Sequence, residues 1–232
     1  MKLAANPQHL FHRMLHCQAI EAVPREFTGV RVSSRERSQG RIPAVVFSQR
    51  IPDGSSNLDP RKHILTIDMN EMNSLLRSIK LPFFLSTTFL LQIRAGKGSS
   101  HLLKSGNVLP IKVHKDEKTG KLLNVVFVWA ENREQLKVNI PIVFKGEEKS
   151  PGISKGGTLR KIRSSIRYLC PALHIPQKIE VDVSQLDVED KIFMNDVKVH
   201  PSLQLLSRND LLPVCKIAGL YPQSESSSEF IS

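Results

Sequence analysis

Arginine side chains crowd one short stretch of this sequence, RVSSRERSQGRIPAVVFS, at residues 31–48. Its first eleven positions hold four arginines and three serines, after which the sequence turns apolar. A guanidinium group is planar and makes two parallel charge-assisted hydrogen bonds to a phosphate, and serine hydroxyls can donate further ones. If SSRER forms a short helical turn, Arg35 and Arg37 fan outward from it. The stretch therefore predicts a phosphate-binding surface, and the alternative is a solvated loop whose arginines pair with Glu26 and Glu36.

The net charge of the chain is unevenly distributed. Residues 1–133 carry 20 Lys and Arg against 10 Asp and Glu, whereas the rest of the chain carries 13 against 12. Six arginines lie within 26 positions of the first half: Arg25, Arg31, Arg35, Arg37, Arg41 and Arg50. This asymmetry indicates a half that binds a polyanion and a half with another task. Folded RNA is the favoured polyanion, because a membrane-surface protein more often shows a basic amphipathic helix with large apolar anchors.

No motif of catalysis or of cofactor binding is convincing. GISKGG (152–157) lacks the GxxxxGK[ST] order of a phosphate-binding loop, and the SSS run at 226–228 has no G-x-S-x-G frame. Asp187, Glu189 and Asp190 could bind a hard cation, but an exposed turn fits their spacing better. We predict a protein that is not an enzyme and that has no cofactor and no small-molecule substrate.

The two ends of the chain differ in composition from its middle. Residues 1–20 contain no acidic residue and predict either an organelle transit segment or a flexible leader. Three histidines and a cysteine in that stretch could ligate a metal, but a flexible segment offers nothing to orient them, so we predict no metal site (His9, His12, His16 and Cys17). Residues 221–232 predict a disordered tail. The three cysteines show no CxxC spacing, which favours a reducing compartment. No run approaches the roughly 18 apolar residues of a membrane span, so we expect a soluble protein.

The first half predicts short strands separated by turns. The strands rich in Val, Ile, Leu and Phe are 43–48, 63–68, 87–94, 107–114 and 122–129. Asn70–Lys80 instead has the apolar spacing of a helix, with Asn70 as its N-cap and Pro82 as its stop. DEKTG (116–120) predicts the turn of a hairpin between the last two strands. Together these elements predict a small β-barrel at residues 21–133.

The second half, residues 134–220, predicts a mostly β domain. A polar run at 131–137 marks the boundary, and strand-like patterns resume in VNIPIVFKG, IPQKIEVDVS, DKIFMNDVKV and LLPVCKI. Residues 158–169 are ambiguous, since their apolar positions fit either a helix or an irregular strand. The predicted fold class is therefore mainly β with short helices.

Several motifs resemble one known family. REFTG…SSRERSQGRIPAVVF, VLPIKVHKDEKTGKLLNVVF and VNIPIVFKGEEKSPGISKGG are similar to segments of the bacterial-type large-subunit ribosomal proteins related to general stress protein CTC, the "L twenty-five" family. LCPALHIPQKIEVDVSQLDVEDKIFMNDV resembles the second domain of its longer members. The resemblance covers about residues 20–219. It implies an amino-terminal barrel similar to the anticodon-binding barrel of glutaminyl-tRNA synthetase, and binding of 5S ribosomal RNA.

The resemblance also implies which residues face RNA. Arg25, Ser33, Arg35 and Arg37 match the family's motif directly, while Ser34 replaces a common arginine and Phe47 a tyrosine. In the hairpin, Asn124 and Val126 replace a histidine and an aspartate, and the loss of these hydrogen-bonding groups predicts a weaker 5S contact. The full set of predicted RNA-binding residues is Arg25, Arg31, Ser33, Ser34, Arg35, Arg37, Arg41, Phe47, His114, Lys115 and Asn124.

Three functions stay open at this point. The first is a structural ribosomal protein with 5S rRNA, other rRNA and neighbouring ribosomal proteins as partners, in a mitochondrion or, alternatively, in a bacterium or another organelle. The second is a protein-interaction module attached to the ribosome mainly through the second domain. The third is an enzyme fragment related to a tRNA synthetase, against which the missing ATP-binding motifs count.

Overall fold

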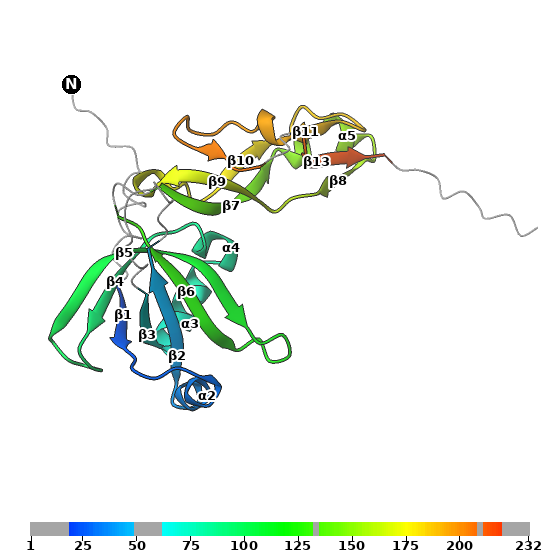
Figure 1. The fold of residues 1–232 in the computed structure, drawn as a ribbon. Helices are drawn as coiled ribbons and strands as arrows, with labels where there is room; N and C mark the ends of the chain where they lie inside the picture. Colours follow the sequence, from blue (N-terminus) through cyan, green and yellow to red (C-terminus); the bar gives the residue numbers. More distant parts are fainter. Residues whose placement is uncertain (1–18, 49–61, 132–134, 208–210, 220–232) are drawn as a thin grey trace, which may run out of the picture. The chain divides into compact units, whose positions relative to one another are not determined.

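The computed structural model describes residues 19–48, 62–131, 135–207 and 211–219 (Figure 1). Of these residues, one compact unit holds those up to Pro141 together with Arg167–Lys178 and His200–Leu206, and a second unit holds the remainder. None of the helices in these ranges is long and apolar enough to cross a membrane. Arg50, the residues of the leader up to position 18 and the tail from position 220 lie outside the described residues.

Six strands form a closed barrel in the order β1-β3-β2-β6-β5-β4. Their bounds are β1 Ala19–Pro24, β2 Arg41–Phe47, β3 His63–Asp68, β4 Phe89–Arg94, β5 Leu102–Lys115 and β6 Leu122–Trp129. Parallel pairing of β1 with β4 closes the barrel. The predicted fold class and the small barrel are confirmed. β1 was not predicted, because its short sequence AIEAVP shows little alternation of apolar and polar residues.

Alternation of apolar residues builds the interior of the barrel. In β4, Phe89, Leu91 and Ile93 are buried while the residues between them are half-exposed. The same period of two places Val125 and Phe127 of β6 in the core. Each fully buried side chain of this kind contributes about 1.5–3 kcal/mol to folding. The residues between them point outward and are free to form a binding surface.

Two short helices follow β3: α3 (Met69–Ser78) and α4 (Leu81–Phe84). The predicted N-cap Asn70 is wrong, because the Asp68 carboxylate accepts hydrogen bonds from the backbone N–H groups of Asn70 and Glu71 at 2.9 and 3.4 Å. Pro82 lies in the first turn of α4, where a missing N–H costs nothing, and α3 ends before it at Ser78.

The remaining described residues form two further sheets, in the orders β10-β7-β9-β12 and β11-β13-β8. The elements are β7 Gln135–Lys145, η1 Glu147–Lys149, α5 Pro151–Ser154, β8 Thr158–Lys161, β9 Ser165–Pro171, η2 Ala172–His174, β10 Ile179–Asp182, β11 Lys191–Phe193, η3 Met194–Asp196, β12 Gln204–Leu205 and β13 Pro213–Ala218. The ambiguous segment 158–169 forms strands. Ile166, Tyr168 and Cys170 are buried at every second position, which a helix would not allow.

Candidate nucleic-acid interface

The arginine-rich stretch forms a helix, α2 (Val30–Ser38), that connects β1 to β2 (Figure 1). It begins after Gly29, whose φ of 121° suits glycine, and the backbone N–H of Ser33 donates to the carbonyl of Gly29 at 3.0 Å. At its end Gly40, with φ 77°, turns the chain directly into β2. The predicted helical turn at SSRER is thus confirmed and extends to nine residues.

One face of α2 is exposed to solvent. Arg31, Ser34, Arg35 and Ser38 are all exposed, and their spacing of i, i+3, i+4 and i+7 places them along a single face of a helix. Arg37, on the other side, is half-buried. The exposed face therefore carries two guanidinium groups and two hydroxyls. Ser38 was not predicted, although the same spacing would have included it.

The inner side of α2 is attached to the end of β1 by an ion pair. The Nη1 of Arg25 lies 2.6 Å from Glu36 Oε2, and the two side chains are only 10% and 14% exposed. The same Nη1 donates a longer hydrogen bond, 3.5 Å, to Ser33 Oγ. Arg25 and Ser33, both predicted to face RNA, thus contact each other. Their contacts orient the helix and present its other face.

Three predicted residues share the outer face of the barrel. His114 of β5 lies opposite Asn124 near the start of β6, whereas Phe47, the last residue of β2, lies opposite Val128 near the other end of β6. All three predicted side chains, His114, Asn124 and Phe47, are half-buried. The Oδ1 of Asn124 is buried and accepts no hydrogen bond from the described residues. Lys112 and Val126 are opposed on the same face, so a further cation joins the row.

The helix and the β5–β6 hairpin turn lie at the same end of the barrel. β2 and β6 are parallel neighbours, with Ala44 opposite Val125. Consequently the start of β2, where α2 ends, lies beside the start of β6, where the turn ends (Figure 1). The strands that carry these two elements are about 80 residues apart in the sequence. Their pairing brings the two halves of the predicted surface together.

Asp116 forms the hairpin turn. Its carboxylate accepts hydrogen bonds from the Thr119 hydroxyl and from the backbone N–H of Lys118, and its carbonyl accepts the N–H of Gly120 at 2.8 Å. The hydrogen bond from Thr119 is the main reason why the pKa of Asp116 is lowered. Gly120 has φ 67°, a conformation that favours glycine. The predicted turn is confirmed.

The end of the barrel defined by α2 and the hairpin is strongly basic; we call it the basic end. Its cationic residues are Arg31, Arg35, Arg37, Arg41, Lys112, Lys115, Lys118 and Lys121. None of them forms an ion pair with a carboxylate of the described residues, whereas Arg25 is neutralised by Glu36. Lys112, Lys118 and Lys121 were not predicted, although the quoted hairpin motif contains them all. Unpaired cations of this density suit a phosphate backbone.

An exposed aromatic residue adjoins the helix. Phe27, in the loop before α2, is 70% exposed, and Val30 is 85% exposed. Phe27 belongs to the REFTG motif, but no sequence pattern predicted a role for it. Aromatic rings on nucleic-acid-binding surfaces stack on unpaired bases, which makes Phe27 a candidate for such a contact.

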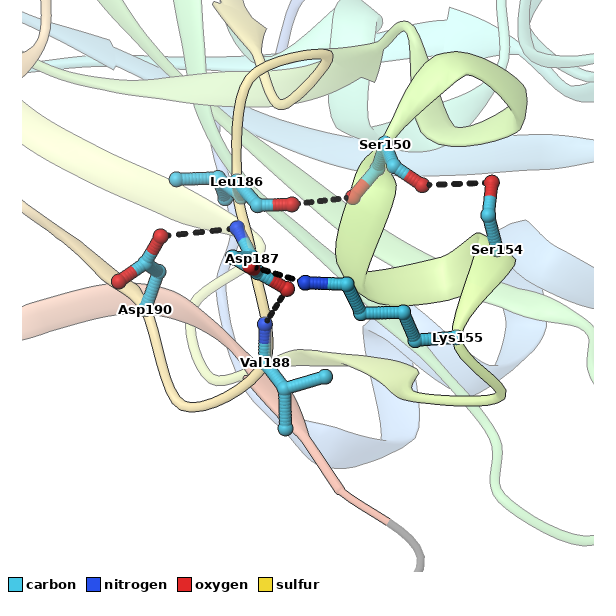
Figure 2. A network of polar contacts seen from close by, with 7 residues as sticks. All are labelled: Ser150, Ser154, Lys155, Leu186, Asp187, Val188 and Asp190. Atoms are coloured by element: carbon cyan, nitrogen blue, oxygen red, sulfur yellow. Dashed lines mark hydrogen bonds and ion pairs between the residues drawn. The ribbon is translucent and has the colours of Figure 1, made fainter.

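Asp187 and Asp190, two of the three acidic residues considered for a cation, lie in a turn (Figure 2). Lys155 Nζ lies 2.5 Å from Asp187 Oδ2, and Asp187 Oδ1 accepts the N–H of Val188 at 2.7 Å. The Asp190 carboxylate accepts the N–H of Asp187 at 2.8 Å. Lys155, from the GISKGG stretch, thus serves an ion pair that lowers the pKa of Asp187. Among the described residues there is no group of three potential metal ligands.

Comparison with known proteins agrees with this architecture. Residues 135–219 match the family model described as ribosomal protein TL5, C-terminal domain. The chain is 27% identical over 198 residues to a large ribosomal subunit protein bL25 of Afipia carboxidovorans, an alignment that covers 85% of this chain and 74% of the relative. The proteins of the same description from a Chelativorans species and from Gloeobacter violaceus are 29% identical over 180 residues and 28% identical over 177. Those alignments cover 78% and 76% of this chain, and 76% and 74% of the relatives.

A closed barrel followed by a TL5-type domain defines a class of two-domain β proteins, and this chain is a member of that class. More specifically, it is similar over most of its length to members of the bL25 family of ribosomal proteins, at 27–29% identity. The family is structural and not enzymatic, in agreement with the predicted absence of catalysis.

Proposed function

We propose that this chain is a structural constituent of the large ribosomal subunit and that its barrel binds 5S rRNA through the basic end. The observation that carries the proposal is the parallel pairing of β2 with β6. It brings the exposed face of α2 and the lysine-rich hairpin together on one barrel. Ribosomal proteins from other organisms cover most of the chain, which supports rRNA and neighbouring ribosomal proteins as its partners.

The residues of the basic end have different tasks in this proposal. Arg31 and Arg35 bind phosphates through their paired N–H groups, and Ser34 donates to a phosphate or a 2′-hydroxyl. Arg25 acts indirectly: its ion pair with Glu36 holds α2 in place.

The outer face and the hairpin supply the remaining contacts. His114 and Asn124 lie beside each other and offer polar groups to a base edge or to a 2′-hydroxyl. The Phe47 ring, at the far end of β2 from the basic end, stacks on RNA that extends along the outer face of the barrel. Lys115 and the other hairpin lysines bind phosphates as point charges. Val126 contributes no hydrogen bond, so we expect this contact to be weaker than one made through an aspartate.

The location proposed is the ribosome of a mitochondrion. Support comes from residues 1–20, which contain no acidic residue. The relatives are bacterial, which is compatible with a bacterial ribosome as the alternative. Fusion of residues 1–40 to a fluorescent protein in cultured eukaryotic cells tests the proposal. Import into mitochondria is the expected result, and a diffuse cytosolic signal would contradict it.

The decisive experiment is a salt titration of 5S rRNA binding by the full chain and by the R31Q/R35Q variant. Loss of two phosphate contacts should lower affinity about ten- to a hundredfold and reduce the slope of log K against log[salt] by about 1.5–2. The matched control is R77Q/K80Q, which removes the same charge from exposed positions in α3 and the loop after it.

The control separates a local site from a general effect of charge. Equal losses in both double variants would mean that only net charge matters and would contradict the assignment of the basic end. Unchanged binding by R31Q/R35Q would contradict a role of α2 in RNA binding.

A further inference from the structure

Three cations lie side by side across the sheet β11-β13-β8. Lys191 of β11 is the register partner of Lys216 of β13, and Lys216 is in turn the partner of Arg160 of β8. Residues directly opposite in antiparallel strands point to the same face, so the three side chains form one row; we call it the cationic ladder. Cys215 and Ile217 of β13, which are fully buried, alternate with Lys216 and point to the opposite face. Lys191 and Arg160 are exposed and Lys216 is half-buried.

The cationic ladder is not neutralised within the described residues. Three other lysines of the same compact unit are each paired: Lys145 with Glu180, Lys155 with Asp187 and Lys161 with Glu147, at 2.5–2.7 Å. No ion pair joins Arg160, Lys191 or Lys216 to a carboxylate of the described part of the chain.

The acidic residues next to the ladder in the sequence are engaged by the backbone. Asp190 accepts the N–H of Asp187, and Glu189 Oε1 accepts the N–H of Gly219 at 3.3 Å. Neither is paired with Lys191, although Asp190 immediately precedes it. Among the residues that the structure describes, the row of like charges is therefore not compensated by a carboxylate.

Such a row is unfavourable for an isolated sheet. Neighbouring strands lie about 4.8 Å apart, and like charges directly opposite each other destabilise the pairing. An external anion with closely spaced charges removes this repulsion. We propose that the cationic ladder binds the phosphate backbone of RNA, which gives this chain a second RNA contact independent of the basic end of the barrel.

RNA fits the ladder better than an acidic protein surface does. Protein–protein interfaces are depleted of lysine and are built around aromatic and other large anchors, whereas nucleic-acid interfaces are strongly positive. The three ladder side chains are all cationic. The identity of the RNA as rRNA rests on the proposed function; the phosphate chemistry of the ladder does not.

The test uses the full chain with two probes, 5S rRNA and an unrelated RNA hairpin of about 40 nucleotides. The ladder variant is R160Q/K191Q/K216Q, and the matched control is K145Q/K155Q/K161Q, which removes the same charge from paired lysines. For both probes the ladder variant should lower the slope of log K against log[salt] by about 2–3, and the control should leave it unchanged. The Tm of the ladder variant should rise by about 1–4 °C, because the repulsion is removed.

Each other outcome overturns the proposal. Unchanged RNA binding would mean that the ladder contacts no phosphate. A fall in both Tm and binding would make the ladder a structural element. Ladder-dependent binding of poly(L-glutamate) without ladder-dependent binding of RNA would identify an acidic protein partner. The ladder variant is also measured in the R31Q/R35Q background. Failure of the barrel assignment then appears as unchanged binding by R31Q/R35Q, independently of the ladder result.

Discussion

The ion pair between Arg25 and Glu36 allows a positioning role to be separated from a direct contact with RNA. Both side chains are nearly buried, with 10% and 14% of their surface exposed, and Arg25 also donates to Ser33. The perturbation is a set of three variants: Arg25→Gln, Glu36→Gln and the double variant. Either single variant leaves one charge nearly buried without a partner, while the double variant leaves two uncharged amides in its place.

The structure sets the expected magnitude. An exposed ion pair contributes about 0.2–1 kcal/mol, and removal of one partner from a buried pair costs about 3–5 kcal/mol. Because this pair is close to the buried limit but retains some solvent contact, we expect each single variant to lose about 2–3 kcal/mol. For a chain of this size that corresponds to a fall in Tm of about 5–10 °C. The double variant should recover at least half of the loss, because no charge is left unpaired.

Binding of 5S rRNA, measured at a temperature where every variant is folded, then assigns the role. If Arg25 only positions α2, R25Q binds weakly and the double variant R25Q/E36Q returns to within about threefold of the wild-type affinity, with an unchanged salt slope. The R35Q variant serves as the opposite control, since loss of an exposed arginine should weaken binding without lowering Tm. The reasoning is refuted if R25Q/E36Q binds as weakly as R25Q with a slope smaller by about 1, because Arg25 would then contact a phosphate.

Three further predictions concern single side chains. Replacement of Phe27 by alanine should weaken RNA binding about five- to a hundredfold with no change in salt slope, since stacking releases no counterions; unchanged affinity would exclude a stacking role. Burial raises the pKa of the Cys170 thiol to about 11 and raises that of Cys215. In a Cys17→Ser chain both thiols should therefore resist a disulfide reagent at pH 8 until guanidinium unfolds the protein, and rapid native labelling would contradict their burial. Burial also raises the pKa of Glu71, so its contribution to stability is fully present below about pH 4.5 and is lost as the pH rises through the raised pKa. Glu71→Gln, which cannot ionise, should have a higher Tm than the wild type at pH 7 and a similar Tm at pH 3.5, and a lower Tm at pH 7 would mean that attraction to the α3 N-terminus outweighs burial.

Local sequence patterns were sufficient to predict much of the fold and part of the basic end. The alternation of β4 and the polar turn at residues 116–120 are visible in the sequence, because each depends on neighbours a few positions away. The exposed face of α2 follows from spacing alone once the stretch is known to be helical. Five of the eight cations of the basic end were predicted from the sequence (Arg31, Arg35, Arg37, Arg41 and Lys115), because the arginine cluster and the hairpin motif are visible in residue identity alone.

Helix capping shows where local pattern was insufficient. Asn70 and Asp68 are both good N-cap residues, and the choice between them depends on where β3 ends. That end is determined by the pairing of β3 with β2, in which Asp68 lies opposite Arg41. A contact with a distant strand thus decided a boundary that the sequence left open.

By itself, the sequence determined that the chain has a basic half, that its strands alternate and that it resembles the bL25 proteins, because composition and motifs are carried by residue identity alone. Tertiary structure decided which arginine pairs with a carboxylate and which is exposed. Arg25 is neutralised by Glu36, eleven positions away, whereas Arg35 is exposed on the other side of the same helix and forms no ion pair with the described part of the chain. The cationic ladder likewise exists only through the pairing of three strands that are distant in the sequence. No hairpin turn joins these three strands, so their register depends on which face of each strand is buried in the folded domain.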